Sequence, residues 1–155
     1  KNHMGYLFWG PVGTGKSYLA ACIANALLEQ EVTVKMTNFN TILNDLFAAE
    51  DKTEYIRLLN GYELLIIDDL GVERNSEYAL ENIFSVIDWR YQSGKPLIIT
   101  TNIPLVQLKQ ETKIEKKRIY DRILERCIPV KIDGVSRREA MANDNMRTIK
   151  NILKI

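Results

Sequence analysis

The chain has 155 residues, of which 46% are hydrophobic and 26% are charged, and its net charge at neutral pH is +1. This length is enough for one packed core and too short for two sizeable ones, so the sequence predicts a single domain over residues 1–155. No stretch reaches the roughly 18 consecutive apolar residues of a membrane span, and no leader with a cleavage site opens the chain. A membrane protein is therefore excluded, and we expect a cytoplasmic one.

Charge is unevenly distributed along the chain. Residues 1–108 carry eight Lys and Arg against thirteen Asp and Glu, whereas residues 109–155 carry thirteen against seven. A basic segment of this kind is typical of a nucleic-acid-binding face, but a solvated helix with ion pairs between neighbouring turns gives the same pattern. The charge distribution alone therefore leaves the partner open.

Short apolar runs rich in β-branched residues indicate five strands, and helical periodicities lie between them. The strands are expected at residues 6–9, 32–37, 64–68, 96–101 and 130–132. Strands that alternate with helices predict an α/β fold, with a five-stranded and mainly parallel sheet between helices. The third run is apolar at every position from 64 to 67, which is typical of a central strand covered on both faces.

Three helices are predicted from apolar stripes at helical spacing. Their members are Leu19, Ile23, Ala26 and Leu27 in the first helix, Ile42, Leu43, Leu46 and Phe47 in the second, and Tyr78, Ile83, Val86, Ile87 and Arg90 in the third. Ser76 is expected to cap the third helix and Gly94 to end it.

The two cysteines, Cys22 and Cys127, lack metal-ligand spacing and are predicted to be buried thiols. Residues 137–155 predict one more helix, and residues 1–5 include a candidate cloning remnant.

The segment between the first strand and the first helix carries the most specific signal in the chain. Residues 10–17 read Gly-Pro-Val-Gly-Thr-Gly-Lys-Ser, which predicts a P-loop that binds ATP or ADP. The glycines let backbone N–H groups surround phosphate oxygens, Lys16 neutralises the β and γ phosphates, and the Ser17 hydroxyl reaches Mg²⁺. The positive N-terminal end of the helix adds to this attraction. The predicted nucleotide contacts are Gly10, Pro11, Val12, Gly13, Thr14, Gly15, Lys16, Ser17 and Tyr18.

Polar side chains follow two of the later strands. Asp68 and Asp69 end the third strand, an arrangement in which Asp68 holds the water shell of Mg²⁺ and Asp69 polarises the attacking water. Many related ATPases carry Glu at the second position, so the shorter Asp69 predicts slow intrinsic hydrolysis. Asn102 ends the fourth strand, and a parallel sheet would place it beside Asp69, where its amide orients the water and senses the γ-phosphate. Its alternative role is to start the Asn-Ile-Pro turn.

Arginines recur between residues 118 and 126, on a predicted helix remote from the P-loop. A fixed guanidinium there could complete the site of a neighbouring subunit as an arginine finger. The alternative is a helix surface on which Asp121 and Glu125 are ion-pair partners, and the residues alone favour this second interpretation.

Three segments together resemble a known family: residues 10–30, 64–102 and 118–138 are similar to the AAA+ ATPase domain of the DnaC/DnaI helicase loaders. The resemblance runs over residues 6–138, and 64–102 is its most specific part. The IstB-like transposition helper ATPases share much of the pattern. The resemblance implies a P-loop NTPase of the AAA+ type in which residues 137–155 form a minimal C-terminal lid helix. It also implies that the helices between residues 38 and 60 are the insertion typical of the initiator branch.

The resemblance further implies roles for individual residues. Arg122 matches the arginine finger that acts in trans, and Arg138 matches the second sensor of the γ-phosphate, with Arg137 as the competing choice. Ser76 and Tyr78 fall where similar loaders contact single-stranded DNA, although Tyr78 could equally be a core aromatic residue. The implied partners are single-stranded DNA, further copies of the chain in a spiral oligomer, and a replicative DNA helicase. Loaders grip this helicase through an N-terminal region to which nothing here corresponds.

The function expected from these observations is an ATP-dependent helicase loader in DNA replication initiation, with hydrolysis that is slow alone and stimulated by assembly or DNA. The first alternative is an IstB-like helper that forms filaments on duplex DNA and recruits a transposase. The second is an ATP-gated DNA-binding module with negligible hydrolysis. A small-molecule kinase is disfavoured, because the chain shows neither an acceptor pocket nor an arginine-rich lid.

Overall fold

The computed structural model describes residues 5–71, 75–134, 136, 141 and 146, and its centre is one parallel β-sheet. The strands are β1 (Gly5–Trp9), β2 (Val34–Asn38), β3 (Leu64–Leu70), β4 (Leu97–Thr101) and β5 (Ile128–Lys131). Their order in the sheet is β2-β3-β4-β1-β5, and every neighbouring pair is parallel. The predicted five-stranded sheet is confirmed. The main differences are that β2 begins at Val34 instead of residue 32, that β3 continues two residues beyond Asp68, and that β5 begins at Ile128.

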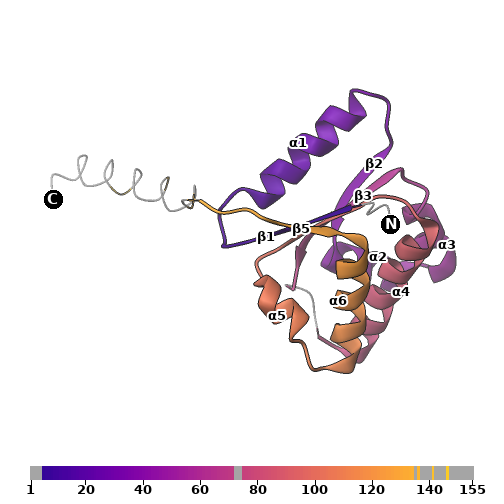
Figure 1. The fold of residues 1–155 in the computed structure, drawn as a ribbon. Helices are drawn as coiled ribbons and strands as arrows, with labels where there is room; N and C mark the ends of the chain where they lie inside the picture. Colours follow the sequence, from indigo (N-terminus) through magenta and orange to yellow (C-terminus); the bar gives the residue numbers. More distant parts are fainter. Residues whose placement is uncertain (1–4, 72–74, 135, 137–140, 142–145, 147–155) are drawn as a thin grey trace.

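Helices cover the two faces of the sheet unequally. The helices are α1 (Lys16–Leu28), α2 (Phe39–Ala48), α3 (Lys52–Leu59), α4 (Glu77–Ser93), α5 (Leu105–Lys109) and α6 (Ile114–Arg126). Among the described elements, α1 alone lies over one face, and the other five helices gather on the opposite side (Figure 1). No described helix has the combination of length and apolar character that a bilayer crossing requires.

The core forms two layers because side chains alternate across the strands. Leu65 and Ile67 of β3 join the larger cluster, which packs against α2, α4 and α6. Leu64 and Ile66 face the opposite way, into a smaller cluster under α1. All four side chains are buried, so the prediction that β3 is a central strand covered on both faces is confirmed.

The buried face of α1 differs from the predicted stripe. Ala20 and Ala24 are buried against the sheet, whereas Leu19, Cys22 and Ala26 are exposed. Only the narrow side of α1 that meets the sheet is covered, and small alanines let the helix lie close to the strands. The predictions of a buried Leu19, Ala26 and Cys22 are therefore wrong.

One member of the α2 stripe was also placed wrongly. Ile42, Leu43 and Leu46 are buried as predicted, but Phe47 is 82% exposed. Phe47 lies one residue beyond the buried stripe, so the helical rotation of about 100° per residue carries it away from the core. The buried Cys127 was predicted correctly, and its burial raises the pKa of the thiol to about 12.

A fully buried arginine fastens the edge of the sheet where the strands begin. Arg90 of α4 donates hydrogen bonds to the carbonyl oxygens of Tyr62, Glu63 and Pro96, at 2.6–3.1 Å. Burial, together with the charge of Arg126, lowers the pKa of Arg90 to about 10, which still leaves it charged at neutral pH. Because Glu63 and Pro96 directly precede β3 and β4, Arg90 fixes the two strands whose far ends carry the polar residues.

Both ends of α4 match the prediction. The Ser76 hydroxyl accepts a hydrogen bond from the Ala79 N–H at 3.2 Å, which satisfies one of the unpaired donors of the first turn. Gly94 ends the helix in the left-handed conformation, with φ of 72°.

We expect Ser76→Ala to lower the free energy of unfolding by about 1 kcal/mol, because the Ala79 N–H loses its partner. Urea denaturation measures this change. Ser85→Ala is the matched control, since Ser85 lies within the same helix, bonds the Glu81 carbonyl and caps nothing. Equal stability of the two variants would contradict the capping role.

Candidate functional site

The residues predicted to handle phosphate meet at one edge of the sheet. β1, β3 and β4 are parallel, so their carboxyl ends open onto the same side, which is where α/β sheets bind ligands. A cleft of about 250 Å³ lies there, lined by Val12, Gly13, Gly15, Lys16, Ser17, Tyr18, Asp69 and Asn102. A larger cavity of about 570 Å³ lies at the opposite edge, but its lining is mainly apolar. We therefore assign the phosphate chemistry to the smaller, polar cleft.

The loop between β1 and α1 depends on left-handed glycines. Gly15 is the N-cap of α1 with φ of 95°, and Gly13 has φ of 81°. A side chain at Gly13 would also collide with the Ser136 hydroxyl, so both conformation and space require glycine. The backbone N–H groups of the first turn of α1 consequently face the cleft, as a phosphate site requires.

Lys16 is the central cation of the cleft. Its side chain is only 5% exposed, and its ammonium donates to the carbonyls of Gly10 at 2.9 Å and Pro11 at 2.6 Å. These acceptors belong to the P-loop itself, so the positive charge is held inside the loop. Phosphate oxygens that enter the loop would take over these hydrogen bonds as stronger, charged acceptors.

The two carboxylates at the end of β3 have different environments. Asp68 is half-buried, and its Oδ1 accepts a hydrogen bond from the Thr100 hydroxyl at 2.6 Å. Asp69 is exposed and has the unusual φ of 57°, in the left-handed region. Its side chain lines the phosphate cleft, together with Asn102. The structure thus brings Asn102 to the cleft that Asp69 lines, although their roles in hydrolysis stay predictions.

Thr100 is the residue of this site that the sequence analysis missed. It is fully buried on β4, donates to Asp68 and accepts a hydrogen bond from the Asp69 N–H at 2.9 Å. The available signal was the run Thr100-Thr101-Asn102, three polar residues at the end of an apolar strand. Only the last of them was assigned a role.

The residues present fit a magnesium ion that arrives with a nucleotide. The described part of the chain contains no cluster of three or more His, Cys, Asp or Glu side chains suited to a metal. Mg²⁺ needs no such cluster, because it is commonly held by one or two carboxylates, water and substrate phosphates. Ser17 and Asp69 line the cleft, whereas Asp68 lines a second hollow that it shares with Asp69, and all three supply this type of oxygen donor.

Arg122 lies on α6, and it is not among the residues that line the phosphate cleft. Its Nε is 3.0 Å from a carboxylate oxygen of Asp88, and its guanidinium lies 4.6 Å from the centre of the Tyr91 ring. A longer contact of 3.5 Å joins it to Glu125. The predicted partner Glu125 is present, whereas Asp121 pairs with Lys117 instead. Arg122 is thus held against α4, by contacts with Asp88 and Tyr91, at a partly exposed position on α6.

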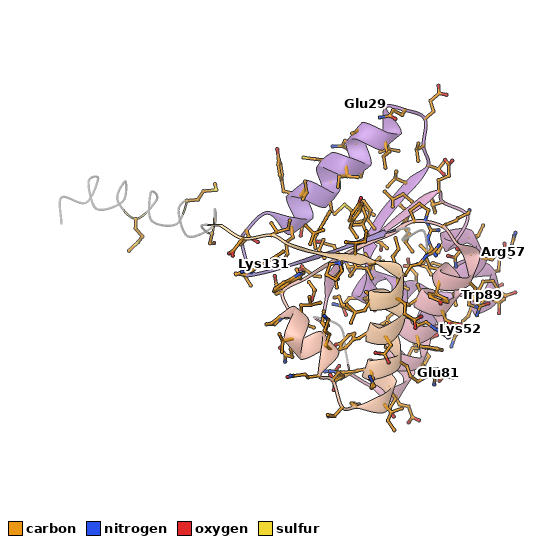
Figure 2. The ribbon with its side chains drawn as sticks, in the orientation of Figure 1. Glu29, Lys52, Arg57, Glu81, Trp89 and Lys131 are labelled. Atoms are coloured by element: carbon orange, nitrogen blue, oxygen red, sulfur yellow. The ribbon has the colours of Figure 1, made fainter. Side chains whose placement is uncertain are left out.

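The two candidate DNA contacts lie at the start of α4. Ser76 serves as the helix cap, and Tyr78 is 38% exposed, so the alternative of a core tyrosine is wrong. The Lys52 ammonium lies 4.7 Å from the centre of the Tyr78 ring. Figure 2 shows Lys52 on the α3–α4 side of the molecule, far from Lys131 at the P-loop end of β5. Any DNA contact by Tyr78 is therefore separate from the phosphate cleft.

The second-sensor candidates Arg137 and Arg138, and most of the predicted helix at residues 137–155, lie outside the described residues. The described Ser136 lies against Gly13 of the P-loop. The chain thus returns to the phosphate site just before these two arginines.

Comparison with known proteins identifies the family. The family model described as "IstB-like ATP binding protein" matches residues 2–144. The chain is 29% identical to the replicative helicase loader DnaC of Escherichia coli (strain K12) over 127 residues, which are 79% of this chain and 51% of the relative. It is 31% identical to an insertion sequence IS232 protein of Bacillus thuringiensis over 138 residues, 85% of this chain and 54% of the relative. The crystal structure of DnaI superposes with a TM-score of 0.73 and 27% identity, covering 88% of this chain and 74% of that one.

The chain belongs to the family of IstB-like ATP-binding proteins, and its fold is that of the AAA+ P-loop ATPases. The predicted resemblance and the predicted binding of ATP are confirmed. The chain spans about half the length of the curated relatives that it matches.

Proposed function

We propose that this ATP-binding domain is the nucleotide switch of a DnaC/DnaI-like replicative helicase loader acting in the initiation of DNA replication. The observation that carries the proposal is the convergence of Lys16, Ser17, Asp69 and Asn102 on one cleft at the carboxyl edge of the sheet. That convergence provides a phosphate cradle together with groups able to activate water. The similarity to DnaC and to the DnaI structure supplies the biological setting.

In the proposed reaction, Lys16 and the backbone of the P-loop bind the triphosphate. Ser17 and Asp68 would hold Mg²⁺, which neutralises charge on the phosphates when it is bound. Asp69 polarises the attacking water, and the Asn102 amide orients that water toward the γ-phosphate. The exposure of Asp69 supports access of water to this position.

We propose that hydrolysis is slow in one subunit because the site is completed by a neighbour. Arg122 would enter the site of the adjacent subunit as the arginine finger, consistent with its surface position on α6. Arg138 would contact the γ-phosphate from within the same subunit. Ser136, which is two residues before Arg138, lies against Gly13 of the P-loop, and this contact supports the second role.

We further propose that subunits assemble as a spiral on single-stranded DNA. An exposed tyrosine with a neighbouring lysine, as at Tyr78 and Lys52, is suited to stack on a base and attract its phosphate. Ser76 would support this contact from the start of α4. We assign helicase binding to an N-terminal region outside the ATPase fold, as the resemblance to the helicase loaders implies.

The second candidate is a transposition helper that assembles on duplex DNA. It is favoured by the family model and by the similarity to the IS232 protein. The two candidates use the same ATP site, so they differ in the DNA and the protein partner rather than in the chemistry.

The deciding experiment is co-elution of the natural protein with its cognate replicative helicase, in ATP, in ADP and without nucleotide. A complex that forms in one nucleotide state and dissociates in another is expected for the loader. Failure to bind the helicase, together with ATP-dependent filaments on duplex DNA, would establish the transposition helper instead. Phosphate release is measured in the same samples. Its presence would exclude an ATP-gated module without hydrolysis, and its absence would establish one.

A further inference from the structure

A buried hydroxyl on β4 joins the two carboxylate residues at the end of β3. Thr100 is 0% exposed, and its Oγ donates a hydrogen bond to Oδ1 of Asp68 at 2.6 Å. The same oxygen accepts a hydrogen bond from the backbone N–H of Asp69 at 2.9 Å. One side chain thus contacts both residues that the proposed reaction assigns to Mg²⁺ and to water.

We propose that Thr100 is a positioning residue for Mg²⁺-nucleotide: it orients the Asp68 carboxylate toward the metal and fixes the irregular strand end that aims Asp69 at the cleft. This inference rests on the proposed function, because it concerns the same ATP site. It adds a residue of β4 that contacts neither phosphate nor metal itself.

The contact with Asp68 restricts the carboxylate. A hydroxyl-to-carboxylate hydrogen bond of 2.6 Å is short and charge-assisted, which is the stronger class of hydrogen bond. It engages Oδ1 on the β4 side and leaves Oδ2 for the water shell of a metal ion. With its rotamer already fixed, Asp68 loses little conformational freedom when Mg²⁺ arrives.

The contact with Asp69 compensates for a break in the sheet. The pairing of β3 with β4 is regular up to Ile67 and Ile99 and resumes with a shifted register at Leu70 and Thr101. Asp69 lies within this irregular stretch in the left-handed conformation, which costs about 1 kcal/mol or more for a residue other than glycine. The Thr100 hydroxyl binds the Asp69 N–H where the ladder is interrupted. Irregular strand ends of this kind re-aim a side chain beside a functional site.

The next residue on β4 has a similar hydroxyl in a different setting. Thr101 is also 0% exposed, but its hydroxyl donates to the Leu70 carbonyl at 2.7 Å and accepts from the Ile103 N–H at 3.1 Å. Both of these partners are backbone groups, and neither is a carboxylate. Thr101→Val therefore removes an equally buried hydroxyl without releasing Asp68.

The test compares Thr100→Val, Thr100→Ser and Thr101→Val with the unsubstituted 155-residue chain. Affinity for a fluorescent ATP analogue is titrated with Mg²⁺ and with excess EDTA, and thermal unfolding is recorded for each protein. In EDTA, we expect the affinity of Thr100→Val to lie within about twofold of that of the unsubstituted chain. Mg²⁺ raises the affinity of the unsubstituted chain, and we expect this increase to be about tenfold smaller in Thr100→Val. Thr100→Ser restores the hydroxyl and is expected to retain the gain. Thr101→Val is expected to unfold at a lower temperature and still retain the gain.

The outcomes separate this inference from the proposed function. If Mg²⁺ raised the affinity of Thr100→Val as much as that of the unsubstituted chain, the positioning role would be overturned. It would also be overturned if Thr100→Ser or Thr101→Val lost as much of this increase in affinity as Thr100→Val. A parallel loss of affinity in EDTA and in Mg²⁺ would also overturn it, because the hydroxyl would then support the fold alone. Absence of ATP binding by the unsubstituted chain would overturn the proposed function as well.

Discussion

Replacing Lys16 with alanine is expected to reduce the affinity for ATP roughly a thousandfold. The substitution removes two charge-assisted hydrogen bonds to phosphate oxygens, which together contribute about 4 kcal/mol of binding free energy. Lys16 is the one lysine or arginine among the described residues that line the cleft, and its ammonium is held inside the P-loop. Isothermal titration with ATP and Mg²⁺ measures the loss.

The same substitution has a structural effect that must be measured separately. The Lys16 ammonium bonds the Gly10 and Pro11 carbonyls, so its removal leaves these acceptors to water and loosens the loop. Thermal unfolding of the variant quantifies this cost. Lys109→Ala, which removes an exposed lysine at the end of α5, is the control and should bind ATP normally. An ATP affinity of Lys16→Ala within tenfold of the unsubstituted chain would contradict the assignment of the P-loop.

Features encoded in contiguous sequence were predictable. The P-loop joins a strand to a helix within eight residues, so its position and its glycines were evident from spacing alone. The strands were recognised by their apolar, β-branched runs, and the parallel sheet followed from their alternation with helices. Ser76 and Gly94 marked the ends of α4 correctly because caps depend on a few neighbouring residues.

Features that depend on distant parts of the chain were not predictable. The contact of Thr100 with Asp69 arises from the irregular register between β3 and β4, and the two residues are 31 positions apart in the sequence. Sequence periodicity gives the spacing of apolar residues but not the direction from which the sheet covers a helix. That is why Leu19 and Phe47 were placed in the core and are exposed. The Asp88 partner of Arg122 belongs to another helix and left no local signal.

The ATP affinity of Arg122→Ala is expected to lie within about twofold of that of the unsubstituted chain. Its assembly-dependent hydrolysis is expected to fall roughly a thousandfold, which is the lower end of what an arginine finger contributes. Affinity is preserved because Arg122 is not among the residues that line the cleft of its own subunit. Because the contact with Glu125 is exposed whereas the contact with Asp88 is partly buried, thermal unfolding of the variant is recorded beside its activity. Steady-state phosphate release with single-stranded DNA measures the effect. Lys117→Ala, which breaks an exposed ion pair on the same helix, should hydrolyse ATP normally.

Mixing two inactive variants tests whether Arg122 acts between subunits. Asp69→Asn keeps Arg122 but lacks the proposed water-polarising carboxylate, whereas Arg122→Ala keeps Asp69 in a cleft that needs an arginine from its neighbour. In a mixed assembly, an Asp69→Asn subunit supplies its arginine to the intact cleft of an Arg122→Ala subunit, so hydrolysis should return at a fraction set by the mixing ratio. A mixture as inactive as each variant alone would show that the arginine does not work in trans. Undiminished hydrolysis by Arg122→Ala alone would remove the finger assignment altogether, and α6 would then be a solvated, salt-bridged surface, as the residues by themselves suggested.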